Sequence, residues 1–170
     1  MDKVLLGDLF ATVLTGIGAT ALMDVWGVIR HPLLGVPAPD YGLVGRWLAW
    51  MPRGRFHHTG IAKSEPMRHE GLIGWTAHYL TGISFASLLV LTYGTDWLHA
   101  PRLVPALLVS LVTLAAPFLL MQPGMGAGIA ASRTPRPNAA RLHSLISHLV
   151  FGVGLYLSSC AVQRLQPLFV

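Results

Sequence analysis

The stretch LLGDLFATVLTGIGATALMDVWGVI, residues 5–29, decides the fold of this chain. A transmembrane helix needs about 20 predominantly apolar residues. This stretch supplies them, with Asp24 inside it and Asp8 at its outer rim. Three further stretches of this kind follow, at about 71–93, 103–121 and 139–161. We therefore predict an all-α membrane protein, a four-helix transmembrane bundle that forms one integral membrane domain over residues 1–170.

The composition supports a membrane location. Of the 170 residues, 53% are hydrophobic and only 11% are charged, whereas soluble domains carry about 25% charged residues. The basic pI does not indicate nucleic acid as a partner, because the basic residues lie where membrane topology would place them. Cys160 is the single cysteine, so no disulfide can form within the chain. We expect the first stretch to stay in place as a span, since residues 1–3 lack the net positive charge of a signal peptide.

The basic residues predict the orientation. Nine of them lie in loops 30–70 and 122–138 or just inside the fourth stretch: Arg30, Arg46, Arg53, Arg55, Lys63, Arg68, Arg133, Arg136 and Arg141. The other side has Lys3, Arg102 and Arg164. The positive-inside rule then places both loops in the cytoplasm and both termini outside.

The first loop contains a short amphipathic segment. Residues 41–51 combine Tyr41, Trp47 and Trp50 with apolar residues, and such aromatic side chains favour the headgroup level. We expect an interfacial helix that anchors the loop on the membrane, in preference to a lid over a ligand. In the third stretch, Pro117 frees a backbone carbonyl one turn earlier and predicts a kink.

Small and polar residues recur every four positions in three of the predicted helices. Such residues share one helix face and let another helix approach closely. The three rows are Thr12, Gly16, Thr20 and Asp24; Gly74, His78, Gly82 and Ala86; and Ser144, His148, Gly152 and Tyr156.

The ionisable members of these rows lie at similar depths. At 1.5 Å per residue, Asp24, His78 and His148 are roughly 8, 10 and 14 Å from the cytoplasmic ends of their helices. Gln122 ends the third stretch on the same side, and the outer halves are mostly Leu, Val, Ile and Ala. We therefore predict a ligand or proton site formed by Asp24, His78, Gln122 and His148. Possible accessory residues are Glu70, His143, His57 and Tyr156.

The chemistry of this site has several interpretations. Imidazoles and a carboxylate can bind zinc, copper or iron, and His78 with His148 could hold a metal ion or a haem. A proton relay through Asp24 is another interpretation. The structural alternative is a packing lock, in which Asp24 hydrogen-bonds one or both imidazoles. No standard hydrolase or redox motif is present, which gives no support for an enzyme.

Several short motifs resemble the bacterial domain-of-unknown-function family 2938. They are Gly18-Ala19-Thr20, Met23-Asp24-Val25-Trp26, Val44-Gly45-Arg46-Trp47, Gly54-Arg55-Phe56-His57, Gly74-Trp75-Thr76-Ala77-His78-Tyr79, Met121-Gln122-Pro123-Gly124-Met125-Gly126 and the segment from His148 to Tyr156. The resemblance implies a four-helix bacterial membrane protein and no defined activity.

These observations together predict a multi-pass protein of the bacterial inner membrane. Its expected activity is to bind or translocate a small ligand, ion or proton through the polar site. The alternatives are a haem- or metal-binding redox protein and a structural or assembly protein. The lipid bilayer is the expected partner. A homodimer is also expected, because four helices alone form a narrow bundle and small-residue faces favour association.

Overall fold

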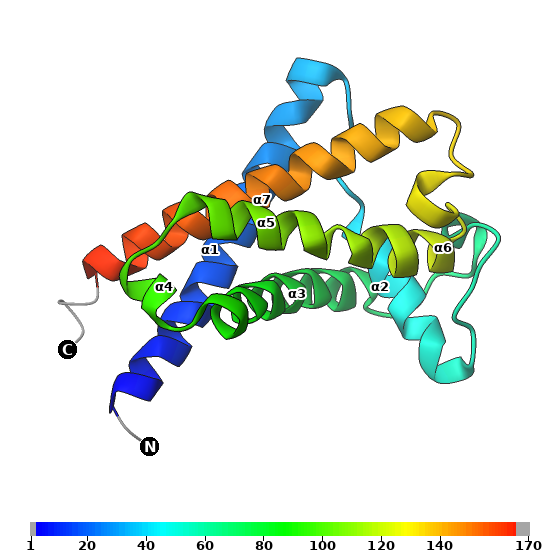
Figure 1. Ribbon diagram of the computed structural model, residues 1–170. Coiled ribbons are helices and arrows are strands. Elements are labelled where there is room, and N and C mark those ends of the chain that lie inside the picture. Colours follow the sequence, from blue (N-terminus) through cyan, green and yellow to red (C-terminus); the bar gives the residue numbers. More distant parts are fainter. Residues whose placement is uncertain (1–2, 166–170) are drawn as a thin grey trace.

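The computed structural model describes residues 3–165, and Figure 1 shows a bundle of long helices. The α-helices are α1 (Lys3–Leu34), α2 (Tyr41–Trp50), α3 (Glu70–Tyr93), α4 (Asp96–His99), α5 (Leu103–Thr113), α6 (Gln122–Met125) and α7 (Pro137–Leu165). Short turns of 3-10 helix are η1 (Met51–Arg53), η2 (Ile61–Lys63) and η4 (Ile129–Ala131), and η3 (Pro117–Met121) is a π-helical turn. Within the described residues there are 4 stretches long and apolar enough to cross a membrane: Val4–Leu34, Glu70–Tyr93, Leu103–Met125 and Pro137–Leu165. The predicted all-α bundle is therefore confirmed.

The helices extend beyond the predicted spans. Helix α1 continues past Ile29 to Leu34 and includes Pro32 in its last turn. The third span is interrupted where a break was predicted: α5 ends at Thr113 and Pro117 begins the π-helical turn. Helix α1 begins and α7 ends at the same end of the bundle, which we call the terminal end (Figure 1). The opposite end, which carries segments 35–69 and 126–136, is called the loop end.

Glycines allow close helix crossings, at Gly16 in a predicted small-residue row and at Gly154 outside these rows. A Cβ atom on Gly16 of α1 would lie 2.6 Å from the Cα atom of Ile83 in α3. A Cβ atom on Gly154 of α7 would lie 2.9 Å from the Cα atom of Ala19 in α1. These faces pack against other helices of the same chain. They therefore give no support for a homodimer, which stays a prediction.

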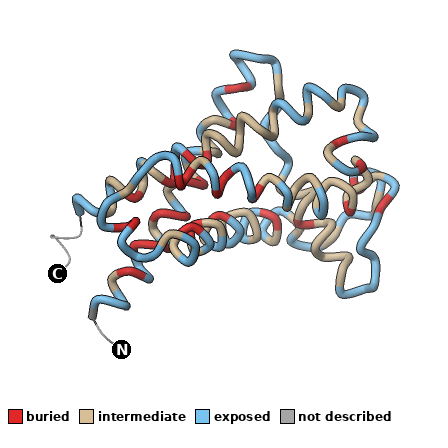
Figure 2. The backbone as a smooth tube through the Cα atoms, viewed as in Figure 1, coloured by how far each residue is buried: buried red, intermediate tan, exposed pale blue. Residues whose placement is uncertain are grey.

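The apolar core lies toward the terminal end. It consists of Ala11, Ala19, Ala86, Leu89, Trp97, Leu98, Ala106, Val109, Phe151 and Leu155. Figure 2 shows buried stretches where the long helices cross, and exposed positions along their outer sides. Large apolar side chains such as Phe10, Leu91 and Val112 are among those exposed, as expected for helices that face lipid.

The terminal end also contains an acid–imidazole pair. Asp8, buried on α1, lies with its Oδ1 atom 3.0 Å from Nε2 of His99 in α4. The terminal half, which is mostly Leu, Val, Ile and Ala, thus contains a polar pair as well. Sequence position alone puts Asp8 at the outer rim of the first span. It does not show that α4 brings His99 to this side chain.

Candidate functional site

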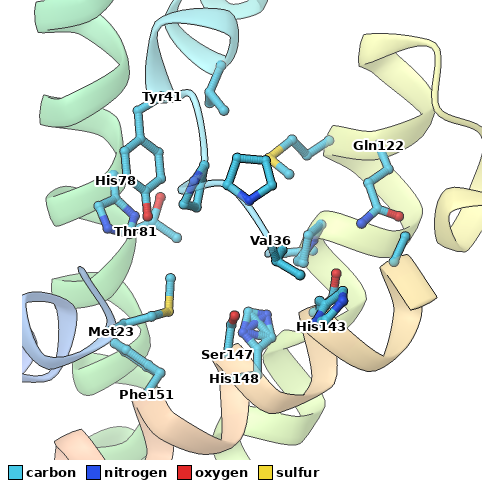
Figure 3. A pocket seen from close by; sticks show the side chains of 18 of the residues that line it. Met23, Val36, Tyr41, His78, Thr81, Gln122, His143, Ser147, His148 and Phe151 are labelled. Carbon is cyan, nitrogen blue, oxygen red and sulfur yellow. The ribbon is translucent and has the colours of Figure 1, made fainter. Parts of the chain in front are cut away.

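A cavity of about 1090 Å³ lies in the loop half of the bundle, beside the apolar core. Its walls come from α1, α2, α3, α7, the third span, the segment that follows α1 and residues 134–136 just before α7 (Figure 3). Phe85 and Phe151 line it and also contact the core, with their rings edge to face at 6.1 Å. The core therefore forms the floor of the cavity.

Asp24 is bonded to three side chains from two other helices. Its Oδ1 atom lies 2.9 Å from Nε2 of His78 and accepts a 3.3 Å hydrogen bond from the Tyr41 hydroxyl. Its Oδ2 atom accepts a 3.0 Å bond from the Tyr79 hydroxyl. In the tautomer that carries a hydrogen on Nε2, His78 also donates to Asp24. Asp24 and His78 thus meet as the depth argument predicted.

Tyr41 links this cluster to the cavity wall. Its ring stacks on the His78 ring at a centroid distance of 4.0 Å, and both residues line the cavity (Figure 3). Burial, together with the Asp24 carboxylate, raises the pKa of the Tyr41 phenol, so the hydroxyl stays a donor. Helix α2 is therefore a wall element packed on α3, and its expected role as only a membrane anchor does not account for these contacts.

His148 and Gln122 also line the cavity, and neither forms a hydrogen bond with Asp24. Both ring nitrogens of His148 and the Oε1 atom of Gln122 are buried, and none has a hydrogen-bond partner among residues 3–165. Figure 3 shows His148 on the α7 side with His143 and Ser147, across from His78 and Tyr41. A packing lock accounts for Asp24 and His78. It does not account for His148 or Gln122, since native structures rarely leave buried polar atoms unpaired.

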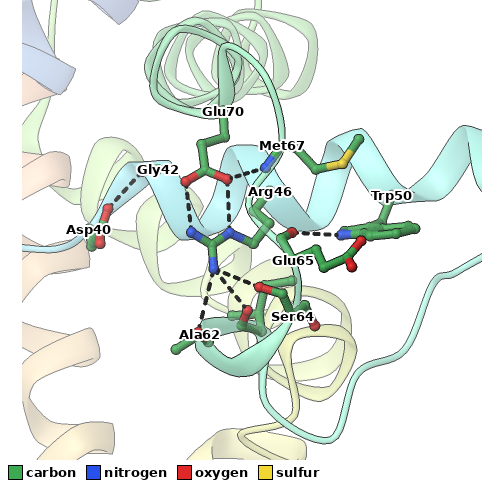
Figure 4. Close-up of polar contacts among 10 residues, drawn as sticks. Asp40, Gly42, Arg46, Trp50, Ala62, Ser64, Glu65, Met67 and Glu70 are labelled. Carbon is green, nitrogen blue, oxygen red and sulfur yellow. Dashed lines mark hydrogen bonds and ion pairs between the residues drawn. The ribbon is translucent and has the colours of Figure 1, made fainter.

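The other three predicted accessory residues lie away from the cavity lining. Glu70 forms a two-bond ion pair with Arg46, with contacts of 2.7 and 2.8 Å, and fixes α2 to the start of α3 (Figure 4). His57 is exposed beside a smaller pocket of about 290 Å³. Tyr156 packs against the apolar core. His143 alone among the accessory residues lines the main cavity.

Sequence reasoning missed two kinds of site residue. Tyr41 and Tyr79 complete the Asp24 cluster, but aromatic residues near the interface also fit a membrane anchor. Arg30 lines the cavity with only 8% of its surface exposed, although it had been counted as a topology signal. Its position one residue after the predicted end of the first span is the feature that separates it from the basic residues further along the loop.

The residues do not assemble a recognisable metal centre. Across the described part of the chain, no group of three or more His, Cys, Asp or Glu side chains is placed to hold a metal ion. The Nε2 atom of His78 is already bonded to Asp24, which leaves only its Nδ1 atom for a ligand role. Binding of haem or a metal by His78 and His148 stays a prediction.

Comparison with known proteins adds the family and no activity. No protein of curated function and no solved structure matches this chain. A family model does match, over residues 13–162, and its description is "Protein of unknown function (DUF2938)". Because this match covers nearly the whole chain, the protein belongs to the DUF2938 family.

Proposed function

We propose that this protein is a bacterial inner-membrane protein that binds a small, largely apolar molecule in the loop-half cavity. The volume of about 1090 Å³ is at the upper end for small-molecule sites. The lining combines apolar side chains with a few polar groups, which is typical of such sites. Nine basic residues near the loop end support a cytoplasmic location for that end and an external location for the termini.

The observation that carries the proposal is the pair of unpartnered nitrogens on His148. An imidazole buried without hydrogen bonds lowers the stability of the fold by about 1–3 kcal/mol. A packing role would not compensate this loss. A ligand that offers a donor or acceptor at this point would remove the cost. Binding is favoured over passage through the bundle, because the apolar core lies between the cavity and the terminal end.

The test is to fill the cavity with a side chain. Ser147 lines it, so Ser147→Trp would occupy the space, whereas Ser84 is exposed on α3 and outside the lining. We expect dodecan-1-ol to bind in a 1:1 ratio to wild type and to Ser84→Trp in phosphatidylcholine nanodiscs, as measured by native mass spectrometry. Ser147→Trp should lose this binding. Equal binding by both variants, or none by wild type, would contradict the proposal.

A further inference from the structure

Within the described residues, arginines are the only formally charged side chains in the cavity lining. It includes two arginines and three histidines, namely Arg30, Arg136, His78, His143 and His148, and no Asp or Glu within the described residues. The nearest acid in the site, Asp24, is not in the lining, and its oxygens already accept bonds from His78, Tyr41 and Tyr79. A cavity with this lining favours a negative ligand group over a positive one.

Arg30 is the buried cation among these residues. Its Nη2 atom donates a 2.7 Å hydrogen bond to the carbonyl of Pro37, while its Nε atom is buried with no partner among residues 3–165. The ion pairs in that range involve Arg46, His78 and His99, so no carboxylate neutralises Arg30. A buried charge without a counter-ion is costly unless a ligand compensates it.

Arg46 is an arginine with a structural role, and its hydrogen-bond partners can be compared with those of Arg30. Its guanidinium bonds both oxygens of Glu70 and donates a 3.0 Å bond to the carbonyl of Ser64 (Figure 4). Arg46 is therefore neutralised by its own chain, and Arg30 is not. Among residues 3–165, the presence of an ion pair at Arg46 and its absence at Arg30 distinguish a structural arginine from a ligand-binding one more clearly than burial does.

The rest of the cavity suits a hydrocarbon chain. Phe85 and Phe151 form its floor, and Leu120 and Met121 of the third span add apolar surface. Arg30 lies at the loop end of α1, and Phe151 lies deeper, where α7 meets the core. The charged and apolar parts of the lining are thus separated along the depth of the cavity.

We propose that the ligand is an amphipathic anion. Its carboxylate or phosphate head accepts hydrogen bonds from Arg30, with Arg136 adding positive charge, and its apolar chain lies against Phe85 and Phe151. This rests on the proposed function, because it names the chemical class of the molecule that the cavity binds.

The test compares three probes with the same chain: dodecyl phosphate, dodecan-1-ol and dodecylamine. Binding to wild type in phosphatidylcholine nanodiscs is measured by native mass spectrometry, with empty nanodiscs as the reference for membrane partitioning. We expect dodecyl phosphate to bind about tenfold more tightly than dodecan-1-ol, since hydrogen bonds to charged groups are stronger than neutral ones. If dodecan-1-ol or dodecylamine binds as tightly as dodecyl phosphate, the inference is overturned while the proposed function survives. If none of the three binds, both fail.

Variants then test the role of Arg30. Arg30→Gln should remove most of the preference for dodecyl phosphate over dodecan-1-ol, whereas Arg30→Lys should keep part of it. Arg53, exposed and stacked over Trp50 outside the cavity, gives the matched control Arg53→Gln, which should behave as wild type. An Arg30→Gln protein with an unchanged preference would refute the assignment. If Arg30→Gln fails to fold, the comparison of the three probes on wild type still tests whether the cavity prefers an anion.

The anion could come from the bilayer or from solution. Replacing phosphatidylcholine by phosphatidylglycerol distinguishes these sources. If phosphatidylglycerol displaces dodecyl phosphate, the natural occupant is an anionic lipid. If it does not, the occupant is a free amphiphilic anion, and both results agree with the proposed chemistry.

Discussion

Gly45 of α2 and Gly74 of α3 pack backbone against backbone. A Cβ atom on Gly45 would lie 2.5 Å from the Gly74 nitrogen and 1.8 Å from the carbonyl oxygen of Glu70. A Cβ atom on Gly74 would lie 1.8 Å from the carbonyl oxygen of Tyr41. This crossing holds α2, and with it Tyr41, in the wall of the cavity.

Gly45→Ala should therefore push α2 away from α3. Because the obstructing atoms are backbone, neither helix can yield locally, and we expect a loss of about 1–3 kcal/mol in stability. Gly71→Ala, on the same helix as Gly74 and with no atom within 4 Å of the added Cβ, is the control. Thermal unfolding of the purified proteins measures both. Equal melting temperatures for the two variants would show that the crossing is not tight.

Asp24→Ala should destabilise the bundle more than Asp24→Asn. Alanine leaves His78, Tyr41 and Tyr79 without their acceptor, whereas asparagine keeps one carbonyl oxygen for them. Interhelical hydrogen bonds in membranes contribute about 0.6–2 kcal/mol each, so a loss of a few kcal/mol is expected for Asp24→Ala. Unfolding in sodium dodecyl sulfate measures the difference. The exposed Asp96, which forms no side-chain hydrogen bond in the described structure, provides the control Asp96→Ala.

His148→Leu should stabilise the ligand-free protein. The substitution removes two buried, unpartnered nitrogens, so the expected gain is about 1–3 kcal/mol in the free energy of unfolding. His99→Leu is the counterpart, because His99 is bonded to Asp8, and this variant should lose stability. A loss at His148 as large as that of Asp24→Ala would instead identify His148 as part of a packing lock.

Acid should loosen the attachment of segment 56–60 to α6. His58 is 7% exposed, its Nδ1 atom lies 2.9 Å from the Ser64 hydroxyl, and its backbone N–H donates to the Gly124 carbonyl. Burial, together with the Arg55 charge, lowers the pKa of His58 below the ordinary 6.5. The unfolded segment then binds more protons than the folded one near that pH, so stability rises with pH and falls on acidification below it.

Limited proteolysis at pH 7.5 and pH 5.5 would detect this change. Wild type should be cleaved faster between residues 53 and 60 at the lower pH. His58→Gln cannot be protonated and should show a smaller difference between the two pH values. The same pH dependence in both proteins would exclude His58 as its source.

The sequence predicted the helices and the contacts that depend on position along them. Apolar length identified the spans, and four-residue spacing identified the face of α1 on which Gly16 meets Ile83. The contact of Gly154 with Ala19 lies outside the predicted rows. The similar depths of Asp24 and His78 correctly predicted that the two side chains meet, because both lie on helices that cross closely.

The sequence did not predict that α7 diverges from α3 toward the loop end (Figure 1). Depth placed His148 beside Asp24, but His148 lies across the cavity from His78, the partner of Asp24 (Figure 3). The position of Tyr41 was also unpredictable, because the Gly45–Gly74 crossing and the Arg46–Glu70 pair join segments distant in sequence.

Segment 35–40 gives the cavity one wall that is not helical, through Val36, Pro37 and Pro39. Prolines have no N–H group, and the Pro37 carbonyl is already taken by Arg30. This wall therefore brings few main-chain groups that need hydration, which lets irregular backbone border an apolar space. Under the proposed function, polar selectivity on that side depends on side chains, and we expect exchange of a single residue such as Arg30 to change which ligand the cavity accepts without rebuilding the wall.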